Sequence, residues 1–146
     1  MRFDEAVSRF ADGSIDLLHI DGRHHFDDVA HDYRSWLPKL SPQAIVLFHD
    51  TNVRERDFGV WRFWAEVSAS SPSFEFLHGH GLGVLAPGSA PPAAFDALFA
   101  LGANPAATAR LRDRFALLGE RWEVEFQRVA ETRDRQALIE LSLIHI

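Results

Sequence analysis

Apolar residues alternate between helical and strand-like spacing over the first part of the chain. From Phe3 to Phe10 they recur at steps of three and four, which predicts a helix that ends at Asp12-Gly13. Two short runs dominated by apolar residues, IDLLHI and AIVLF, are typical of strands buried on both faces of a parallel sheet. The predicted elements are a helix over 3–10, a strand over 15–20, a helix over 26–37, a strand over 44–48 and a helix over 58–69.

Two further short strands are predicted over 74–77 and 82–85, joined by the residues His78-Gly79-His80-Gly81. Glycine permits the positive φ angles that a tight hairpin requires. Two strand–helix units followed by a hairpin predict an α/β fold, in which two parallel strands are extended by a terminal antiparallel hairpin.

The remainder of the chain has a different character. The segment APGSAPP over 86–92 is interpreted as a linker. Beyond it, apolar residues recur at steps of three and four among arginines and glutamates, which predicts an amphipathic or coiled-coil-like helix that either extends away or folds back on its own domain. The chain is therefore divided into residues 1–88 and a linker with a helical tail over 89–146. The apolar positions of the tail are Leu111, Phe115, Leu118, Trp122, Phe126 and Val129.

Composition narrows the classes of partner. A formal net charge of −6 argues against a nucleic-acid partner, because an acidic surface repels phosphate backbones. The absence of cysteine excludes disulfides and thiolate metal sites. No apolar run approaches the roughly 20 residues that span a bilayer, and the acidic N-terminus does not resemble a signal peptide. We expect a cytoplasmic protein without a membrane partner.

Both predicted parallel strands are followed by an acidic residue, Asp21 after the first and Asp50 after the second. Ligands of open α/β sheets bind at the carboxyl ends of the strands, so the two carboxylates are candidate ligands of one divalent cation such as Mg²⁺. His24 lies three residues beyond Asp21, where it could reach a substrate hydroxyl held by that ion. An ordinary pKa near neutrality makes it a candidate general base.

Each candidate also has a structural interpretation. Asp21 or Asp50 could cap the helix that follows its strand, and His25 is an alternative to His24 as the base. Histidines inside or at the end of apolar strands are typical of core or supporting positions, and those between the hairpin strands are interpreted as turn residues. These four histidines are His19, His49, His78 and His80.

The long pattern IDLLHIDGRHHFDDVAHDYRSWLPKLSPQAIVLFHDT, followed by FGVWRFWAEV, resembles the fourth strand, its helix and the fifth strand of class I S-adenosylmethionine-dependent methyltransferases. It is most similar to bacterial methyltransferases related to cephalosporin-hydroxylase-like and sugar O-methyltransferases, over roughly residues 3–86. The resemblance implies a Rossmann-like sheet whose last strand is antiparallel. It also implies metal ligands at Asp21 and Asp50 and a base at His24. The third metal ligand is in doubt, because His49 and Thr51 flank Asp50 where the family has Glu, Asp or Asn.

The family binds its methyl donor through a Gly-rich loop after the first strand, and no such loop occurs in these 146 residues. Residues 1–88 are therefore expected to correspond to the C-terminal half of a methyltransferase domain and to be inactive alone. The apolar ending LSLIHI resembles translated adapter sequence, so we expect the natural protein to differ beyond about Glu140.

The leading functional hypothesis is an O-methyltransferase acting on a sugar or small hydroxylated substrate, with S-adenosylmethionine and a divalent metal as cofactors. An alternative is a non-catalytic or linker domain in a larger glycan-biosynthesis protein fused to a glycosyltransferase. A third is a metallohydrolase that uses His19, Asp21, His24 and His25. Self-association is expected through an exposed edge of the sheet or through the helical tail.

Overall fold

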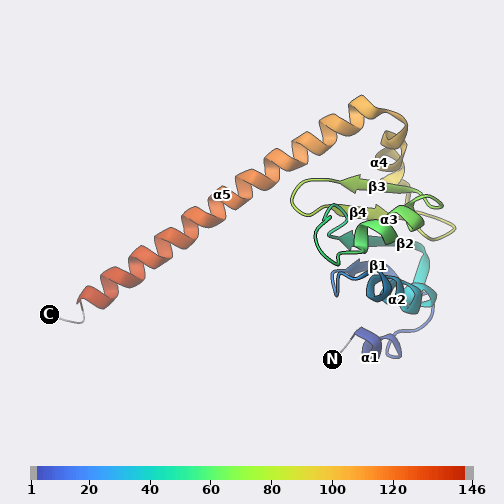
Figure 1. The fold of residues 1–146 in the computed structure, drawn as a ribbon, viewed down its shortest axis with the longest axis horizontal. Helices are drawn as coiled ribbons and strands as arrows, with labels where there is room; N and C mark the ends of the chain where they lie inside the picture. Colours follow the sequence, from blue (N-terminus) through green and yellow to red (C-terminus); the bar gives the residue numbers. More distant parts are fainter. Residues whose placement is uncertain (1–2, 144–146) are drawn as a thin grey trace.

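The structure is a computed structural model that describes the backbone of residues 3–143 and the side chains of residues 3–135. Figure 1 shows a small α/β domain from which one long helix projects. The terminal segment LSLIHI lies outside the residues whose side chains are described. The helices and strands, with 3-10 helices written η, are α1 (Phe3–Val7), β1 (Ile15–Ile20), α2 (Phe26–Trp36), η1 (Leu37–Lys39), β2 (Leu40–His49), α3 (Val60–Ser68), β3 (Ser73–Phe76), β4 (Leu82–Leu85), η2 (Ala93–Phe95), α4 (Asp96–Ala100), η3 (Leu101–Ala103) and α5 (Pro105–Leu143).

The strands form one mixed sheet in the order β1-β2-β4-β3. β1 pairs with β2 in parallel, and the hairpin strand β4 pairs antiparallel with both β2 and β3. The predicted α/β fold with two parallel strands and an antiparallel hairpin is therefore confirmed. The reversed strand lies inside the sheet and β3 forms the edge, because α3 carries the chain past the position that β4 later fills (Figure 1).

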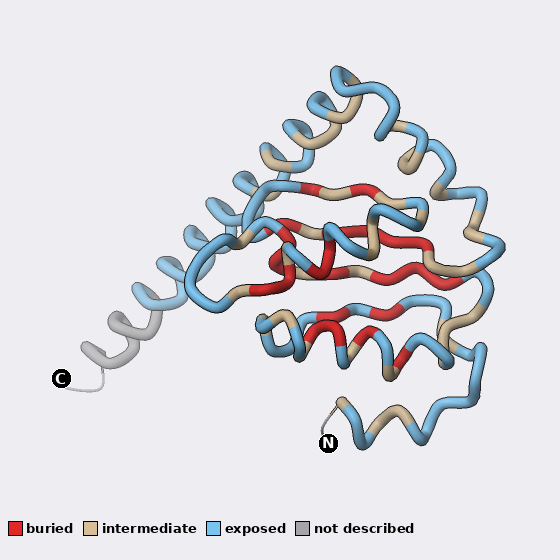
Figure 2. The backbone as a smooth tube through the Cα atoms, turned by 45° about the vertical axis from the view of Figure 1, so that its right-hand side comes forward, coloured by how far each residue is buried: buried red, intermediate tan, exposed pale blue. Residues whose placement is uncertain are grey.

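Alternate residues of β2 face two separate cores. Val46 and Phe48 point to the face covered by α2 and α3, and Ile45 points to the opposite face. On the second face, residues of η2, α4 and the start of α5 pack on the hairpin strands. In Figure 2 the buried residues, drawn in red, follow the strands and the inward faces of the helices. The side chains of the first core include Val29, Tyr33, Trp36, Phe63 and Trp64, and those of the second include Phe74, Phe76, Phe95, Leu98 and Phe99.

β2 begins at Leu40, four residues earlier than predicted, and so includes the Ser41-Pro42 pair that was interpreted as a turn. The strand accommodates Pro42 because its register with β1 shifts there: Ile15 pairs with Leu40, whereas Leu17 pairs with Ile45. A bulge is one of the few places where a strand tolerates proline.

The segment interpreted as a linker lies against the start of this strand. The Ala90 N–H donates to the Pro42 carbonyl oxygen at 3.0 Å. A Cβ at Gly88 would lie 2.2 Å from the same oxygen, so only glycine allows the approach. The chain then continues into η2 and α4, which pack on the second face of the sheet.

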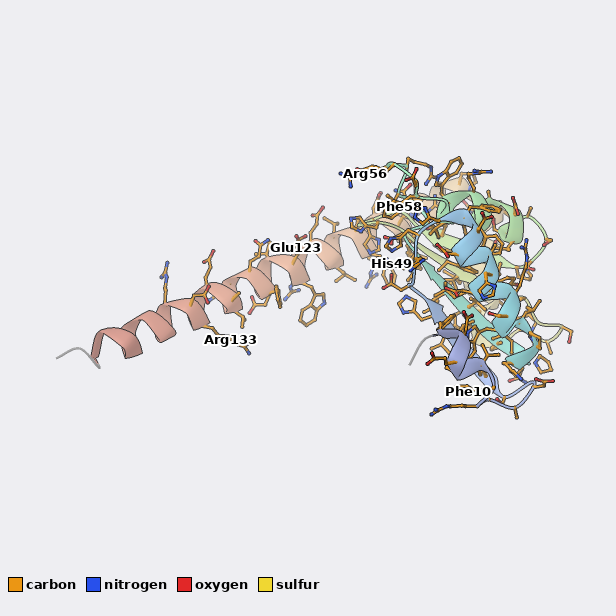
Figure 3. All side chains as sticks on the ribbon, turned by 60° about the horizontal axis from the view of Figure 1, so that its bottom comes forward. Phe10, His49, Arg56, Phe58, Glu123 and Arg133 are labelled. Atoms are coloured by element: carbon orange, nitrogen blue, oxygen red, sulfur yellow. The ribbon has the colours of Figure 1, made fainter. Side chains whose placement is uncertain are left out.

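Over the residues with described side chains, the contacts of the long helix α5 with the domain are made by its N-terminal part. Arg112 Nε donates to the Glu75 carbonyl oxygen at 2.7 Å, and the Phe115 ring lies 4.8 Å from that of Phe76. Beyond this point the helix extends away from the sheet (Figures 1 and 3). Trp122 and Phe126 are 73% and 75% exposed there. Self-association through this helix, or through the outer edge of β1, stays a prediction.

None of the helices in the described part of the chain combines the length and the apolar character needed to cross a membrane.

An exposed histidine–carboxylate pair joins α1 to α2 and can be tested by titration. His31 Nε2 lies 2.8 Å from Asp4 Oδ1, and this hydrogen bond raises the pKa of His31 above 6.5. The contribution of the pair to stability is therefore present below about pH 6.5 and is lost as pH rises through the raised pKa. We expect an NMR titration to give His31 a pKa above 6.5, and Asp4→Asn to lower it. An unchanged pKa in Asp4→Asn would show that the contact is absent in solution.

Candidate functional site

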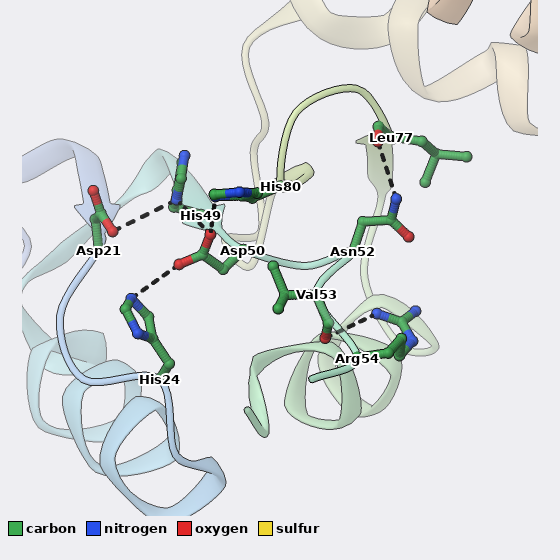
Figure 4. Close-up of polar contacts among 9 residues, drawn as sticks. All are labelled: Asp21, His24, His49, Asp50, Asn52, Val53, Arg54, Leu77 and His80. Carbon is green, nitrogen blue, oxygen red and sulfur yellow. Dashed lines mark hydrogen bonds and ion pairs between the residues drawn. The ribbon is translucent and has the colours of Figure 1, made fainter. Parts of the chain in front are cut away.

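Three sequence-predicted residues meet at the carboxyl ends of the two parallel strands. Asp21 follows β1, Asp50 follows β2, and His24 lies on the loop between β1 and α2. One side-chain nitrogen or oxygen from each of the three lies within 4.8 Å of the others. Figure 4 shows the three side chains turned toward a common point. Parallel neighbouring strands bring their ends to one edge of the sheet, which is why residues distant in sequence converge here.

Asp50 is held firmly at the centre of this site. Its side chain is only 6% exposed, and its backbone has a φ of 62°, a left-handed conformation that Asp tolerates better than most residues. The Asp50 N–H donates to the Gly81 carbonyl oxygen at 3.1 Å, which ties the end of β2 to the hairpin. Helix α3 begins ten residues later, with Gly59 at its N-cap, so Asp50 does not cap it.

His24 faces Asp50 directly. Its Nε2 lies 2.9 Å from Asp50 Oδ2, and its ring stacks on Phe58 with 4.6 Å between ring centres and 9° between planes. The side chain of His24 is 40% exposed, so it reaches both the buried carboxylate and solvent. Asp21 does not cap α2, because that helix has His25 at its N-cap and no side-chain capping bond.

The adjacent histidine, His25, is directed elsewhere. Its Nδ1 donates to the Asp57 carbonyl oxygen at 3.2 Å, and the Gly59 N–H donates to the His24 carbonyl oxygen at 2.7 Å. A Cβ at Gly59 would lie 2.3 Å from the Phe26 nitrogen, so the loop before α3 can approach α2 only with glycine there. These contacts hold the loop that carries Phe58 against His24 and leave His25 outside the cluster.

Two further histidines approach Asp50. His49 Nδ1 lies 3.0 Å from Asp50 Oδ1 and 3.6 Å from Asp21 Oδ1, and His80 Nδ1 lies 3.3 Å from Asp50 Oδ1. The contacts of His49 do not have hydrogen-bond geometry, so its buried Nδ1 is left without a hydrogen-bond partner. From the sequence, His80 is predicted to be a turn residue of the hairpin, without a contact to Asp50. The glycines on either side of it were the available signal, since they mark a turn that returns the chain to the neighbouring strand.

The other residues near Asp50 do not supply an evident third oxygen ligand. Asn52 Nδ2 donates to the Leu77 carbonyl oxygen at 3.0 Å, away from the cluster, and Thr51 is fully buried with no partner for Oγ1. His19 and His25 are also outside the group of converging ligand atoms among residues 3–135. The set proposed for a metallohydrolase is thus not assembled.

A depression of about 550 Å³ opens next to the cluster, with His24 and Asp50 both in its wall. A second depression, of about 440 Å³, lies on the Arg23 side of His24. A larger one, of about 770 Å³, lies between α3, β3 and α5 and contains none of the strand-end residues. The first of these places open space beside both a carboxylate and an imidazole. It is lined by His24, Asp50, Asn52, Val53, Arg54, Glu55, Phe58, Gly79 and His80.

Comparison with known proteins identifies relatives of part of the chain. Residues 1–51 match the family model described as a methyltransferase domain, and this range includes Asp21, His24, His49 and Asp50. The chain is also 57% identical over 83 residues to the uncharacterized protein y4gI of Sinorhizobium fredii. That match spans 57% of this chain but only 9% of the relative.

One solved structure, that of a protein from Corynebacterium glutamicum, is similar to 60% of this chain and 45% of its own, with 20% sequence identity and a TM-score of 0.47.

Proposed function

We propose that residues 1–51, which match a methyltransferase domain, belong to a class I, S-adenosylmethionine-dependent methyltransferase and that the chain contributes the acceptor side of an O-methyltransferase active site. The acceptor would be a hydroxyl group of a sugar or another small hydroxylated compound. The observation that supports this best is the convergence of Asp21, His24 and Asp50 beside an open depression. Two carboxylates and an imidazole at the strand ends suit the deprotonation of a hydroxyl group.

In this proposal His24 takes the proton from the acceptor hydroxyl. The buried Asp50 carboxylate orients the imidazole and stabilises the imidazolium that forms, as carboxylates beside catalytic histidines do. Stacking on Phe58 restricts the ring further and shields one of its faces from water. A positioned base of this kind contributes roughly 10²–10⁴-fold to rate.

The residues present also fit a divalent metal ion. Ligand oxygens lie 2.0–2.6 Å from Mg²⁺ or Ca²⁺, so two ligand atoms on one ion are at most about 5.2 Å apart, and the strand-end atoms lie within 4.8 Å. The Nδ1 of His49 is buried beside both carboxylates without a hydrogen-bond partner, so the polar groups here are not fully satisfied by one another. Asp21 and Asp50 would hold the ion, which would lower the pKa of the acceptor hydroxyl.

The 146 residues contain no Gly-rich loop between a strand and a helix, so we propose that the donor is held by residues outside them. A connecting role remains the second candidate function. It is favoured by α5, whose outer part lies away from the domain with its apolar side chains exposed.

A methyl-transfer assay tests the proposed function. Residues 1–146 alone are expected to transfer no labelled methyl group from S-adenosylmethionine. A longer protein that joins this segment to a donor-binding half is expected to methylate hydroxylated acceptors and to lose activity with EDTA, because removing the ion restores the ordinary pKa of the acceptor hydroxyl. Re-addition of Mg²⁺ or Mn²⁺ should restore turnover. Full activity in EDTA would eliminate the metal, and transfer to nitrogen acceptors alone would eliminate the O-methyltransferase assignment.

A further inference from the structure

The two oxygens of the Asp50 carboxylate, which lies in the wall of the depression, have different neighbours. Oδ2 faces His24 at 2.9 Å. Oδ1 faces His80 Nδ1 at 3.3 Å and the buried Nδ1 of His49 at 3.0 Å. A ring nitrogen on one oxygen restricts rotation of the carboxylate about its last side-chain bond, so it determines where the other oxygen points.

His80 reaches this position because the hairpin is joined to the end of β2. The Asn52 N–H donates to the His80 carbonyl oxygen at 2.9 Å, and the Asp50 N–H donates to that of Gly81. Gly81 has a φ of 90°, and a Cβ there would lie 2.6 Å from the Asn52 nitrogen. Both the turn and the close approach therefore require glycine at this position. Figure 4 shows His80 entering the cluster from the side opposite His24.

We propose that His80 is a positioning residue for the metal centre, acting through Asp50. Its Nδ1 lies 3.3 Å from Oδ1, and this polar contact favours the carboxylate orientation in which Oδ2 faces His24 and the ion. The inference rests on the proposed function only in placing a divalent ion at Asp21 and Asp50. His80 lies outside the 51 residues that match the family model, so the hairpin adds a supporting contact that the matched segment does not contain.

A role at Asp50 accounts for the place of His80 beside a carboxylate, since the hairpin strands themselves require only a turn. The side chain of His80 is 72% exposed, so it contributes little to the core. His78, two residues earlier in the turn, instead lies near the ring of Phe76 at the end of β3, with 6.1 Å between ring centres. His78→Ala is therefore a matched control on the same loop.

The test is a titration of the 146-residue chain with Mn²⁺, which needs no donor and no turnover. We expect His80→Ala to weaken Mn²⁺ binding by about 10- to 100-fold, the usual cost of removing a group that orients a metal ligand. His80→Asn places an amide N–H near the position of Nδ1 and should recover most of the affinity. His78→Ala should bind as the unaltered chain does, and thermal melting without metal should show that all variants are folded.

The outcomes separate this inference from the proposed function. If the unaltered chain binds Mn²⁺ and Asp50→Asn abolishes binding, but His80→Ala does not weaken it, the positioning role is overturned and the metal centre stands. If His80→Asn binds as weakly as His80→Ala, the polar contact with Oδ1 is not the cause and the proposal fails. If the unaltered chain binds no Mn²⁺, or Asp50→Asn leaves binding intact, the metal centre itself is wrong and this inference falls with it.

Discussion

Replacing His24 by alanine, in an active protein that joins this segment to a donor-binding half, should lower kcat by roughly 10²–10⁴-fold. The reason is that the His24 ring contacts Oδ2 of the buried Asp50 carboxylate and also lines both depressions beside the site. Among the described histidines, His24 alone has both properties. The KM for S-adenosylmethionine should change little, because His24 does not contact the donor in the proposed arrangement. The measurement is steady-state methyl transfer at saturating metal, so that weaker ion binding does not mimic loss of the base.

His25→Ala provides the matched control, since the neighbouring imidazole donates to the Asp57 carbonyl oxygen and is not part of the cluster at Asp50. We expect its effect on kcat to be small. A large effect of His25→Ala together with a small effect of His24→Ala would move the base to His25. If neither variant affected kcat, the arrangement of base and carboxylate proposed for this site would be wrong.

The largest loss of stability is expected from Phe48→Ala, at about 3–5 kcal/mol in the free energy of unfolding. Phe48 is fully buried on the central strand, and its ring lies 5.6 Å from Tyr33, 6.0 Å from Phe63 and 5.8 Å from Trp64. Truncation removes the contacts that join β2 to both α2 and α3. It leaves a cavity, because the backbones of the strand and the two helices can move only partly to fill the space. Urea unfolding followed by tryptophan fluorescence gives the difference.

Phe126→Ala makes the same chemical change at a position on α5 that is 75% exposed. Its effect on the free energy of unfolding should stay within about 0.5 kcal/mol, as for most surface substitutions. Equal losses for the two phenylalanines would mean that the outer part of α5 packs on the domain in solution. A loss below about 1 kcal/mol for Phe48→Ala would contradict the packing of the first core.

The strand ends are the part of the site that sequence reasoning could locate. An apolar run followed by Asp, found twice with a helix between, is sufficient to place Asp21 and Asp50 at one edge of a parallel sheet. The metal and base roles assigned to these residues stay predictions, because proximity does not establish what they bind. His24 followed from its short distance to Asp21 along the chain, and local geometry of this kind is well predicted from sequence.

His49 and His80 show why the rest of the site could not be predicted. His49 is the last residue of β2, and the alternation of side chains along a strand does not show which groups a terminal side chain will contact. His80 reaches Asp50 only because β4 enters the sheet between β2 and β3, and a hairpin pattern does not state which strand it will pair with. The turn residues were recognised, but their neighbour across the sheet was not.

The sequence by itself determined the local elements, the α/β class and the two strand-end carboxylates, because hydrophobic spacing and turn residues act over a few positions. Only the tertiary structure decided the order β1-β2-β4-β3, the passage of the 86–92 segment over Pro42 and the partners of Asp50. These depend on which apolar faces are buried together and on where glycine allows two backbones to approach. Such contacts join residues far apart in the chain, and their free energy arises only when the whole sheet has formed.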